Sequence, residues 1–281
     1  MIYPRFNLVP VGKHEVHVTE WGTRGDPPLL MLHGLARTGR DFDEIASALS
    51  DQYHVLCPDM IGRGLSSWSN DPSVEYCVEN YAEISVGLMD AFGFDQAAWL
   101  GTSMGGQIGM RIASGVHRER LTCLLINDIG PEVPDAAIER ILAYVGNPPT
   151  FQSISQAETW LRRTYEPFGP ATDAFWVRMA RTSLRRLSDG QFTLHYDPAI
   201  VRQFLDSADE MTTWGRWDQI TTPTHVYYGT QSDLLISEIL AKMLKTGPRP
   251  GETSFSDCGH APTLSRPADI ALVREFLDKA R

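Results

Sequence analysis

Short apolar runs alternate with segments of helical spacing through the first half of the chain. The apolar runs have the length of strands that are buried on both faces, and they lie at 27–34, 53–59, 97–101 and 121–128. Helical spacing fills the intervals at 41–50 and 78–92, and another helix is expected to begin near Met104. Strands that alternate with helices in this way predict a largely parallel sheet covered by helices.

The two ends of this pattern differ from its middle. Residues 7–10 and 15–20 alternate apolar and polar positions, which is typical of antiparallel strands. Residues 131–215 show helical periodicity with many charged and aromatic side chains, and no strand is expected there. The strand and helix patterns then return, with strands expected at 224–229 and 253–259 and helices at 238–245 and 269–280.

The simplest organisation is an α/β core that is interrupted once. We predict a first part of the core at 1–130, a helical cap at 131–215 and a second part of the core at 216–281. No internal repeat or low-complexity segment suggests a different division of the chain.

The sequence AAWLGTSMGGQIGM (97–110) places a serine among closely spaced glycines. Each glycine costs a helix roughly 1 kcal/mol relative to alanine, so Gly101, Gly105 and Gly106 indicate a constraint on the backbone. Gly-x-Ser-x-Gly between a buried strand and a helix is typical of a nucleophile elbow, a sharp turn that exposes the serine hydroxyl. The glycines would leave room for this turn, and Ser103 would be the nucleophile. The amide of Met104 would then stabilise the negative charge of a tetrahedral intermediate.

The same five residues also fit two simpler interpretations, a glycine-rich turn with a capping serine or a small phosphate-binding loop. A P-loop requires Gly-Lys-Ser/Thr, which is absent, and a dinucleotide-binding fingerprint usually opens the first βα unit rather than the third. The strand–turn–helix context therefore favours the catalytic interpretation.

A serine nucleophile needs a base and a carboxylate that orients the base. His260, in DCGHAPTL (257–264), follows the last expected strand and is the predicted base. Asp233 follows the strand at 224–229, which gives the chain order Ser103, Asp233, His260 that this architecture favours. Asp128 is a competitor, because its loop opens on the same edge of the sheet. Asp233 is the preferred assignment.

An oxyanion hole also needs a second backbone amide. The loop in LLMLHGLARTG (29–39) is suitably placed, and we predict that the amide of Leu35 acts together with that of Met104. His33, in the same loop, is expected to fix the loop through its ring nitrogens. The segment PDMIGRGLSS (58–67) is expected to be a turn-rich architectural loop.

Composition excludes several classes of partner. The net charge is -10 and no basic stripe is present, which argues against a nucleic-acid or anionic-membrane partner. The N-terminus lacks the charge and apolar pattern of a signal peptide, and no apolar run approaches the ~20 residues that span a bilayer. The four cysteines lie far apart and are expected to be reduced. We therefore predict a cytoplasmic location.

Five segments resemble the α/β-hydrolase superfamily in their order and spacing: LHG (32–34), PDMIGRGLSS (58–67), GTSMGG (101–106), GTQSDLL (229–235) and CGHAPTL (258–264). The resemblance implies a mostly parallel eight-stranded sheet with a helical cap inserted after the sixth strand. It also implies a catalytic triad of Ser103, His260 and Asp233, oxyanion amides at Leu35 and Met104, and neither a cofactor nor a metal. A serine at the elbow argues against epoxide hydrolases and haloalkane dehalogenases, which carry aspartate there.

The elbow is similar to those of carboxylesterases, enol-lactonases, cofactor-free perhydrolases and C–C hydrolases of meta-cleavage products. We predict a serine hydrolase that cleaves a small carboxylic ester or lactone through an acyl-enzyme. The alternatives are a C–C hydrolase of a meta-cleavage-type diketone and a perhydrolase, although C–C hydrolases usually carry a longer glycine-rich oxyanion loop. A non-catalytic scaffold would normally lose part of the triad. The aromatic residues of the cap, such as Trp160, Trp176 and Trp214, are expected mostly to pack the cap's own core, with one or two facing the cleft and favouring an apolar acyl or aryl group. The oligomeric state is left open.

Overall fold

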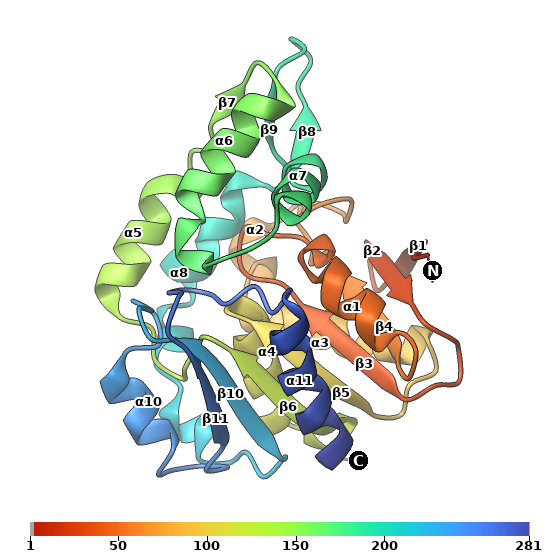
Figure 1. The fold of residues 1–281 in the computed structure, drawn as a ribbon, viewed down its shortest axis with the longest axis vertical. Helices are drawn as coiled ribbons and strands as arrows, with labels where there is room; N and C mark the ends of the chain where they lie inside the picture. The colour runs from red at the N-terminus through yellow and green to blue at the C-terminus, as the bar shows by residue number, and fades with distance from the viewer. Residues whose placement is uncertain (1–2, 281) are drawn as a thin grey trace.

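The computed structural model describes residues 3–280, which fold around an eight-stranded sheet (Figure 1). Its strands are β1 (Arg5–Val11), β2 (His14–Trp21), β3 (Pro28–Leu32), β4 (His54–Pro58), β5 (Ala97–Thr102), β6 (Leu121–Asn127), β10 (Thr224–Gly229) and β11 (Gly251–Phe255). The order across the sheet is β1-β2-β4-β3-β5-β6-β10-β11. The pairs β1·β2 and β2·β4 are antiparallel, whereas all the others are parallel. The predicted mostly parallel eight-stranded sheet is confirmed.

Helices cover both faces of this sheet (Figure 1). One face packs on α1 (Asp43–Leu49) and α11 (Pro267–Lys279), and the other on α3 (Val78–Ala91), α4 (Met104–Ser114) and α10 (Ser237–Met243). Consecutive residues of β5 point to opposite faces of the sheet. Trp99 packs on the α3, α4 and α10 side, whereas Leu100 packs on the α1 and α11 side. Burial on both faces explains why this strand is a continuous apolar run rather than an alternating one.

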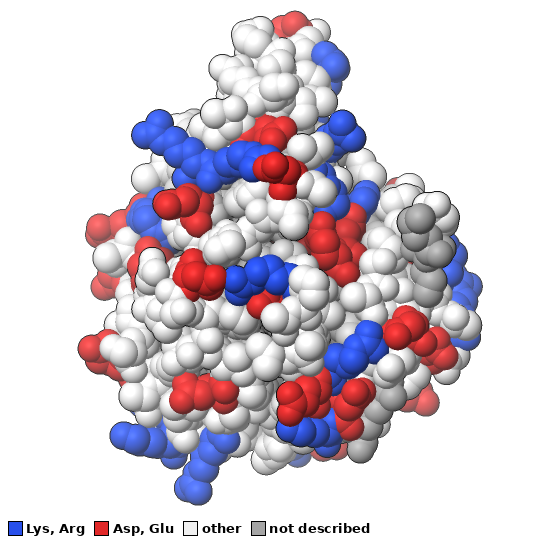
Figure 2. All heavy atoms as spheres, viewed as in Figure 1, with Lys and Arg blue, Asp and Glu red and all other residues white. Residues whose placement is uncertain are grey.

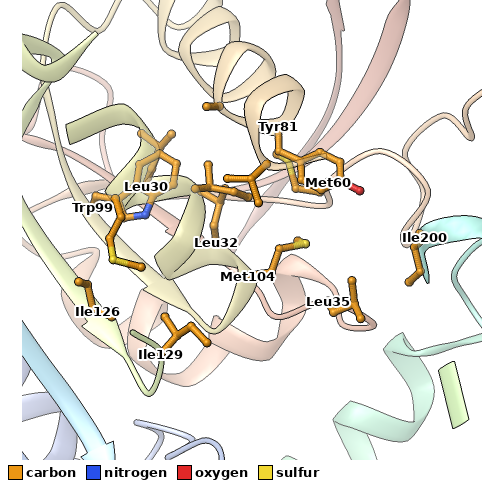
Figure 3. Close-up of a cluster of buried hydrophobic side chains, with 14 of the residues drawn as sticks. Leu30, Leu32, Leu35, Met60, Tyr81, Trp99, Met104, Ile126, Ile129 and Ile200 are labelled. Carbon is orange, nitrogen blue, oxygen red and sulfur yellow. The ribbon is translucent and has the colours of Figure 1, made fainter. Parts of the chain in front are cut away.

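The hydrophobic core between the sheet and helices α3 and α4 extends to the turn at Ser103. Figure 3 shows Leu32 and Trp99 from the sheet, Tyr81 from α3 and Met104 from α4 in one cluster. The indole Nε1 of Trp99 donates a hydrogen bond of 2.9 Å to the backbone oxygen of Gly105. The start of α4 is therefore fixed by both apolar packing and a buried hydrogen bond.

A long insertion joins β6 to β10 and lies over the edge of the sheet where the parallel strands end (Figure 1). Its helices and strands are α5 (Asp135–Val145), β7 (Thr150–Phe151), α6 (Ile154–Thr164), α7 (Asp173–Thr182), β8 (Leu184–Arg186), β9 (Phe192–Leu194), α8 (Arg202–Asp206) and α9 (Trp214–Trp217). The short elements elsewhere and in the insertion are η1 (Gly39–Phe42), α2 (Pro72–Glu75), η2 (Arg118–Arg120), η3 (Glu166–Phe168), η4 (Pro198–Val201) and η5 (Ala208–Met211).

The insertion differs from the expectation of a purely helical segment. Strands β7, β9 and β8 form a separate three-stranded antiparallel sheet. Each of these strands has only two or three residues, which is too short to produce a recognisable period of two. The domain boundaries after residues 130 and 215 stay a prediction, and α9 crosses the second of them.

Charged side chains of both signs are interspersed over the face of the molecule shown in Figure 2. In the part of the chain that the structure describes, no helix has the length and apolar character needed to cross a bilayer. The buried cysteines Cys57, Cys123 and Cys258 are free thiols, as is the partly exposed Cys77. The predicted cytoplasmic location stays a prediction.

Candidate active site

Ser103 lies at a sharp turn between the end of β5 and the start of α4. Its backbone has φ 52° and ψ −117°, a region that residues with a Cβ rarely occupy. The amide of Ser103 donates a hydrogen bond of 2.9 Å to the backbone oxygen of Asn127 on the neighbouring strand. A side chain at Gly101 would overlap the backbone of Gly105, and one at Gly105 would overlap the backbone of Leu32. The predicted reason for these two glycines is confirmed.

His260 connects the serine to a buried carboxylate. Its Nε2 lies 3.0 Å from the Oγ of Ser103, and its Nδ1 lies 2.8 Å from the Oδ2 of Asp128. A proton on Nδ1 that is donated to the carboxylate leaves Nε2 free to accept the proton of the serine hydroxyl. The structure thus brings together Ser103 and His260 as the sequence predicts.

The prediction that Asp233 orients His260 is wrong. The side chain of Asp233 is 52% exposed and forms an ion pair with Arg140, at 2.7 Å between Oδ2 and Nε. Asp128, the competing candidate, has no exposed side-chain surface and occupies the position beside the imidazole.

Local geometry explains why Asp128 takes this position. It follows β6 directly, and its φ of 60° turns the chain just after the strand. Its amide donates to the backbone oxygen of Tyr227 at 2.8 Å, and its Oδ1 accepts a hydrogen bond of 3.1 Å from the amide of Gly229. The carboxylate is therefore held at the end of β10 while its other oxygen faces His260. Asp233 comes four residues after the last residue of β10, on a loop that carries it to the surface.

Asn127 supports the loop of the histidine, a role that sequence reasoning missed. Its Nδ2 donates to the backbone oxygen of Pro262 at 2.8 Å and to the Oγ1 of Thr102 at 3.0 Å. These bonds connect the loop of His260 to the strands that precede Ser103 and Asp128. The signal in the sequence is a polar residue that closes the apolar run LTCLLIND.

The two residues predicted to supply the oxyanion amides belong to segments that lie beside Ser103. Met104 is the first residue of α4, where amides lack an intrahelical acceptor and the helix dipole is positive. The loop that carries Leu35 passes close to the serine, since a Cβ built on Gly34 would lie 3.5 Å from the Cβ of Ser103. The role of the Leu35 and Met104 amides stays a prediction that this geometry supports.

His33 fixes this loop through both ring nitrogens, as expected. Its Nδ1 donates to the backbone oxygen of Gly34 at 2.7 Å, and its Nε2 accepts from the amide of Met60 at 3.0 Å. Burial lowers the pKa of His33 to about 4, so the ring is neutral near pH 7. A neutral ring is what the acceptor role of Nε2 requires.

Arg63 contacts both residues whose amides are predicted to form the oxyanion hole. It has no exposed surface, and its Nε donates to the backbone oxygen of Leu35 at 2.8 Å. Its Nη2 lies 3.3 Å from the Sδ of Met104, while Nη1 donates to the backbone oxygen of Ile61 and to the hydroxyl of Tyr81. All four acceptors are uncharged. The sequence indicates an architectural loop at this point but not that its arginine contacts both residues predicted to supply the oxyanion amides.

Replacement of Arg63 should therefore impair turnover more than substrate affinity. Arg63→Met removes the donor that fixes the Leu35 loop, and we expect kcat to fall by about 10²-fold, as for the loss of one oxyanion donor. Arg63→Lys, which retains a cationic donor group, should lose less. Steady-state kinetics with p-nitrophenyl butyrate and a thermal unfolding curve check this. An unchanged kcat in a folded Arg63→Met protein would contradict the role assigned to Arg63.

A cavity of about 540 Å³ opens onto Ser103 and His260. It is bounded by loops of the core and by the insertion, and its aromatic walls are Phe42, Tyr144, Tyr165, Phe168 and Phe175. The three tryptophans Trp160, Trp176 and Trp214 are not among its lining residues, and two of them pack against other aromatic rings of the insertion. The cavity can hold a small, mostly apolar molecule with its reacting group beside the serine.

Within residues 3–280, no group of three or more His, Cys, Asp and Glu side chains is arranged to hold a metal ion. The hydrogen bonds of Ser103, His260 and Asp128 are suited to proton transfer and to nucleophilic attack by an activated serine.

Comparison with known proteins adds four findings. Residues 29–272 match the sequence profile of the alpha/beta hydrolase family. The chain is 38% identical to a 3-hydroxybutyrate-oligomer hydrolase from Cupriavidus necator, with 99% of each chain covered. It also superposes on an alpha/beta hydrolase from Novosphingobium aromaticivorans with a TM-score of 0.86 and 30% identity, covering 99% of each chain. A Rickettsia typhi protein gives a TM-score of 0.88 at 27% identity, with 99% of this chain and 98% of that chain covered.

Proposed function

Because the chain belongs to the alpha/beta hydrolase family, we propose that it is a serine esterase that hydrolyses short linear oligomers of a 3-hydroxy acid. The hydrogen-bonded series Ser103, His260 and Asp128 is the observation that carries the esterase assignment. The substrate class is supported by the similarity over nearly the whole chain to the 3-hydroxybutyrate-oligomer hydrolase.

Acylation begins when His260 accepts the proton of the Ser103 hydroxyl and the serine oxygen attacks the ester carbonyl. The negative charge that develops on the carbonyl oxygen is stabilised by the amides of Leu35 and Met104. Asp128 keeps the imidazole in the required tautomer and stabilises the imidazolium. His260 then donates its proton to the leaving alcohol, which leaves an acyl group on Ser103.

Deacylation repeats the same steps with water. His260 accepts a proton from a water molecule, and the resulting hydroxide attacks the acyl carbonyl. The oxyanion amides act again, and His260 returns the proton to the oxygen of Ser103 as the acid is released. An oligomer of hydroxy acids yields a hydroxyl-terminated piece in the first stage and a carboxylic acid in the second.

The cavity suits a short chain of this kind. Its walls include apolar side chains such as Leu35, Ile141 and Val145, which match the methyl and methylene groups of a hydroxybutyrate unit. A volume of about 540 Å³ lies within the range of small-molecule sites.

We expect the purified protein to hydrolyse p-nitrophenyl butyrate and the linear dimer of 3-hydroxybutyrate without added metal. EDTA should leave the rate unchanged, because no step in this mechanism uses a metal. Release of p-nitrophenol and chromatography of the dimer products measure these activities. Hydrolysis of a vinylogous diketone without any ester hydrolysis would instead favour a C–C hydrolase.

A further inference from the structure

An exposed ion pair stands at the wall of the cavity that contains the serine. Arg140, from α5 of the insertion, and Asp233, from the loop after β10, face each other across the two parts of the chain. The Nε of Arg140 lies 2.7 Å from the Oδ2 of Asp233, and its Nη2 lies 3.1 Å from Oδ1. Both side chains line the cavity together with Ser103 and His260. The guanidinium of Arg140 therefore forms a bidentate ion pair with the carboxylate of Asp233 at the cavity wall.

The second arginine of the cavity wall is held very differently. Arg37 is 5% exposed and binds Asp41 through Nε at 2.8 Å and Nη2 at 2.6 Å. Removing one partner from a buried pair is strongly unfavourable because it leaves an uncompensated charge. An exposed pair such as Arg140 and Asp233, at 46% and 52%, is worth little because water screens it. Of the two arginines, Arg140 is thus the one that can exchange its partner for a ligand.

The other side chains of α5 that line the cavity are apolar or aromatic. Ile141, Tyr144 and Val145 line the same cavity, and Ile141 and Val145 are buried. A ligand in this cavity would therefore contact both apolar surface of α5 and the cation of Arg140. This combination fits a molecule with an apolar part and an anionic end.

We propose that Arg140 binds the free carboxylate end of a linear oligoester and that Asp233 occupies this position when no substrate is bound. The proposal rests on the proposed function, because an oligomer of hydroxy acids carries one free carboxylate. A substrate carboxylate can form the same bidentate contact with the guanidinium that Asp233 forms now. The site would select acid-terminated oligoesters over neutral esters and lactones.

This exchange predicts effects of opposite sign for the two partners. Arg140→Gln removes the cation and should lower kcat/KM for a free-acid substrate by about 10-fold. Asp233→Asn removes both the competing carboxylate and its repulsion of the incoming anion, so kcat/KM for the same substrate should rise by about 2- to 5-fold.

The measurement compares the linear 3-hydroxybutyrate dimer as the free acid with the methyl ester of that dimer. The two substrates share the internal ester. The methyl ester lacks the terminal charge but carries a second ester bond, so product chromatography counts only cleavage of the internal ester. The readout is the ratio of their kcat/KM values, which we expect to fall in Arg140→Gln and to rise in Asp233→Asn. The preference of the wild type for the free acid should also weaken as salt is added, because exposed charges are screened.

Arg162→Gln is a matched control. Arg162 lies on α6 of the insertion, is 35% exposed, pairs with Glu158 at 2.9 Å and is not among the residues that line the cavity. The control variant should keep the wild-type ratio. Thermal unfolding of all variants verifies that they fold.

Three outcomes would overturn the proposal. Equal fold-changes in kcat/KM for the free acid and the methyl ester, which leave the ratio at its wild-type value, would make the pair a structural link between α5 and the core. Values of kcat/KM that stay at the wild-type level for both substrates in both variants would exclude Arg140 from carboxylate binding. Wild-type protein that hydrolyses neither dimer nor p-nitrophenyl butyrate would contradict the proposed function itself, whereas activity on all three with an unaltered ratio contradicts only the role of Arg140.

Discussion

Replacing Ser103 with alanine is expected to lower kcat for p-nitrophenyl butyrate by about 10⁶-fold, the loss measured when a known serine hydrolase loses its nucleophile. The physical reason is that the Oγ of Ser103 is the attacking atom in the proposed mechanism, and the Nε2 of His260 lies 3.0 Å from it, placed to accept its proton. Folding should be preserved, since the substitution removes one oxygen from a side chain that faces the cavity. Initial rates at high enzyme concentration measure the residual activity.

His260→Ala provides the matching test of the base. It should lose activity to a similar degree, and the double variant should lose little more, because residues that act as a unit are not additive. Losses that multiply in the double variant would show that the two residues act independently, which contradicts proton transfer between them.

Asp128→Asn is expected to lower kcat by about 10⁴-fold, because an amide in place of the carboxylate favours the wrong imidazole tautomer and cannot stabilise the imidazolium. Asparagine has nearly the same shape and keeps an oxygen that can accept from the amide of Gly229. The loss should therefore appear in kcat rather than in the unfolding temperature.

Asp233→Asn is the comparison for this variant, and with p-nitrophenyl butyrate its kcat should fall by less than about tenfold, since an exposed pair contributes little. Kinetics and circular dichroism on both variants, measured side by side, distinguish the two carboxylates. A large loss at Asp233 with a small one at Asp128 would reverse the assignment that the hydrogen bonds of His260 support.

The wrong choice between these carboxylates has a specific physical origin. Strands β6 and β10 are neighbours in the sheet, with Asn127 paired to Tyr227, so their loops open at the same edge. Both aspartates also satisfy the chain order of serine, carboxylate and histidine. The difference lies in the path of the loops, since Asp128 is held by two hydrogen bonds directly after β6 while Asp233 has moved away from the sheet. Local sequence carries little information on such a path.

The sheet and the serine turn were predictable because their causes are local. A strand buried on both faces must be apolar throughout, and a strained elbow must contain glycines at Gly101 and Gly105, where side chains would strike backbone. Contacts such as those of Arg63 with Leu35 and Met104 join residues that are far apart in the chain. These contacts depend on how the loops fold over α4. The spacing of apolar residues along the sequence does not predict that folding.

The proposed acyl-enzyme mechanism is tested most directly by detecting the acyl group on the protein itself. The protein is mixed with p-nitrophenyl butyrate, quenched in acid during the first turnovers, digested and analysed by mass spectrometry. We predict one butyryl group, located on Ser103, and none on protein in which Ser103 is replaced by alanine. A butyryl group on a different residue, or ester hydrolysis without any acylated protein at any quench time, would contradict a mechanism in which Ser103 is the nucleophile.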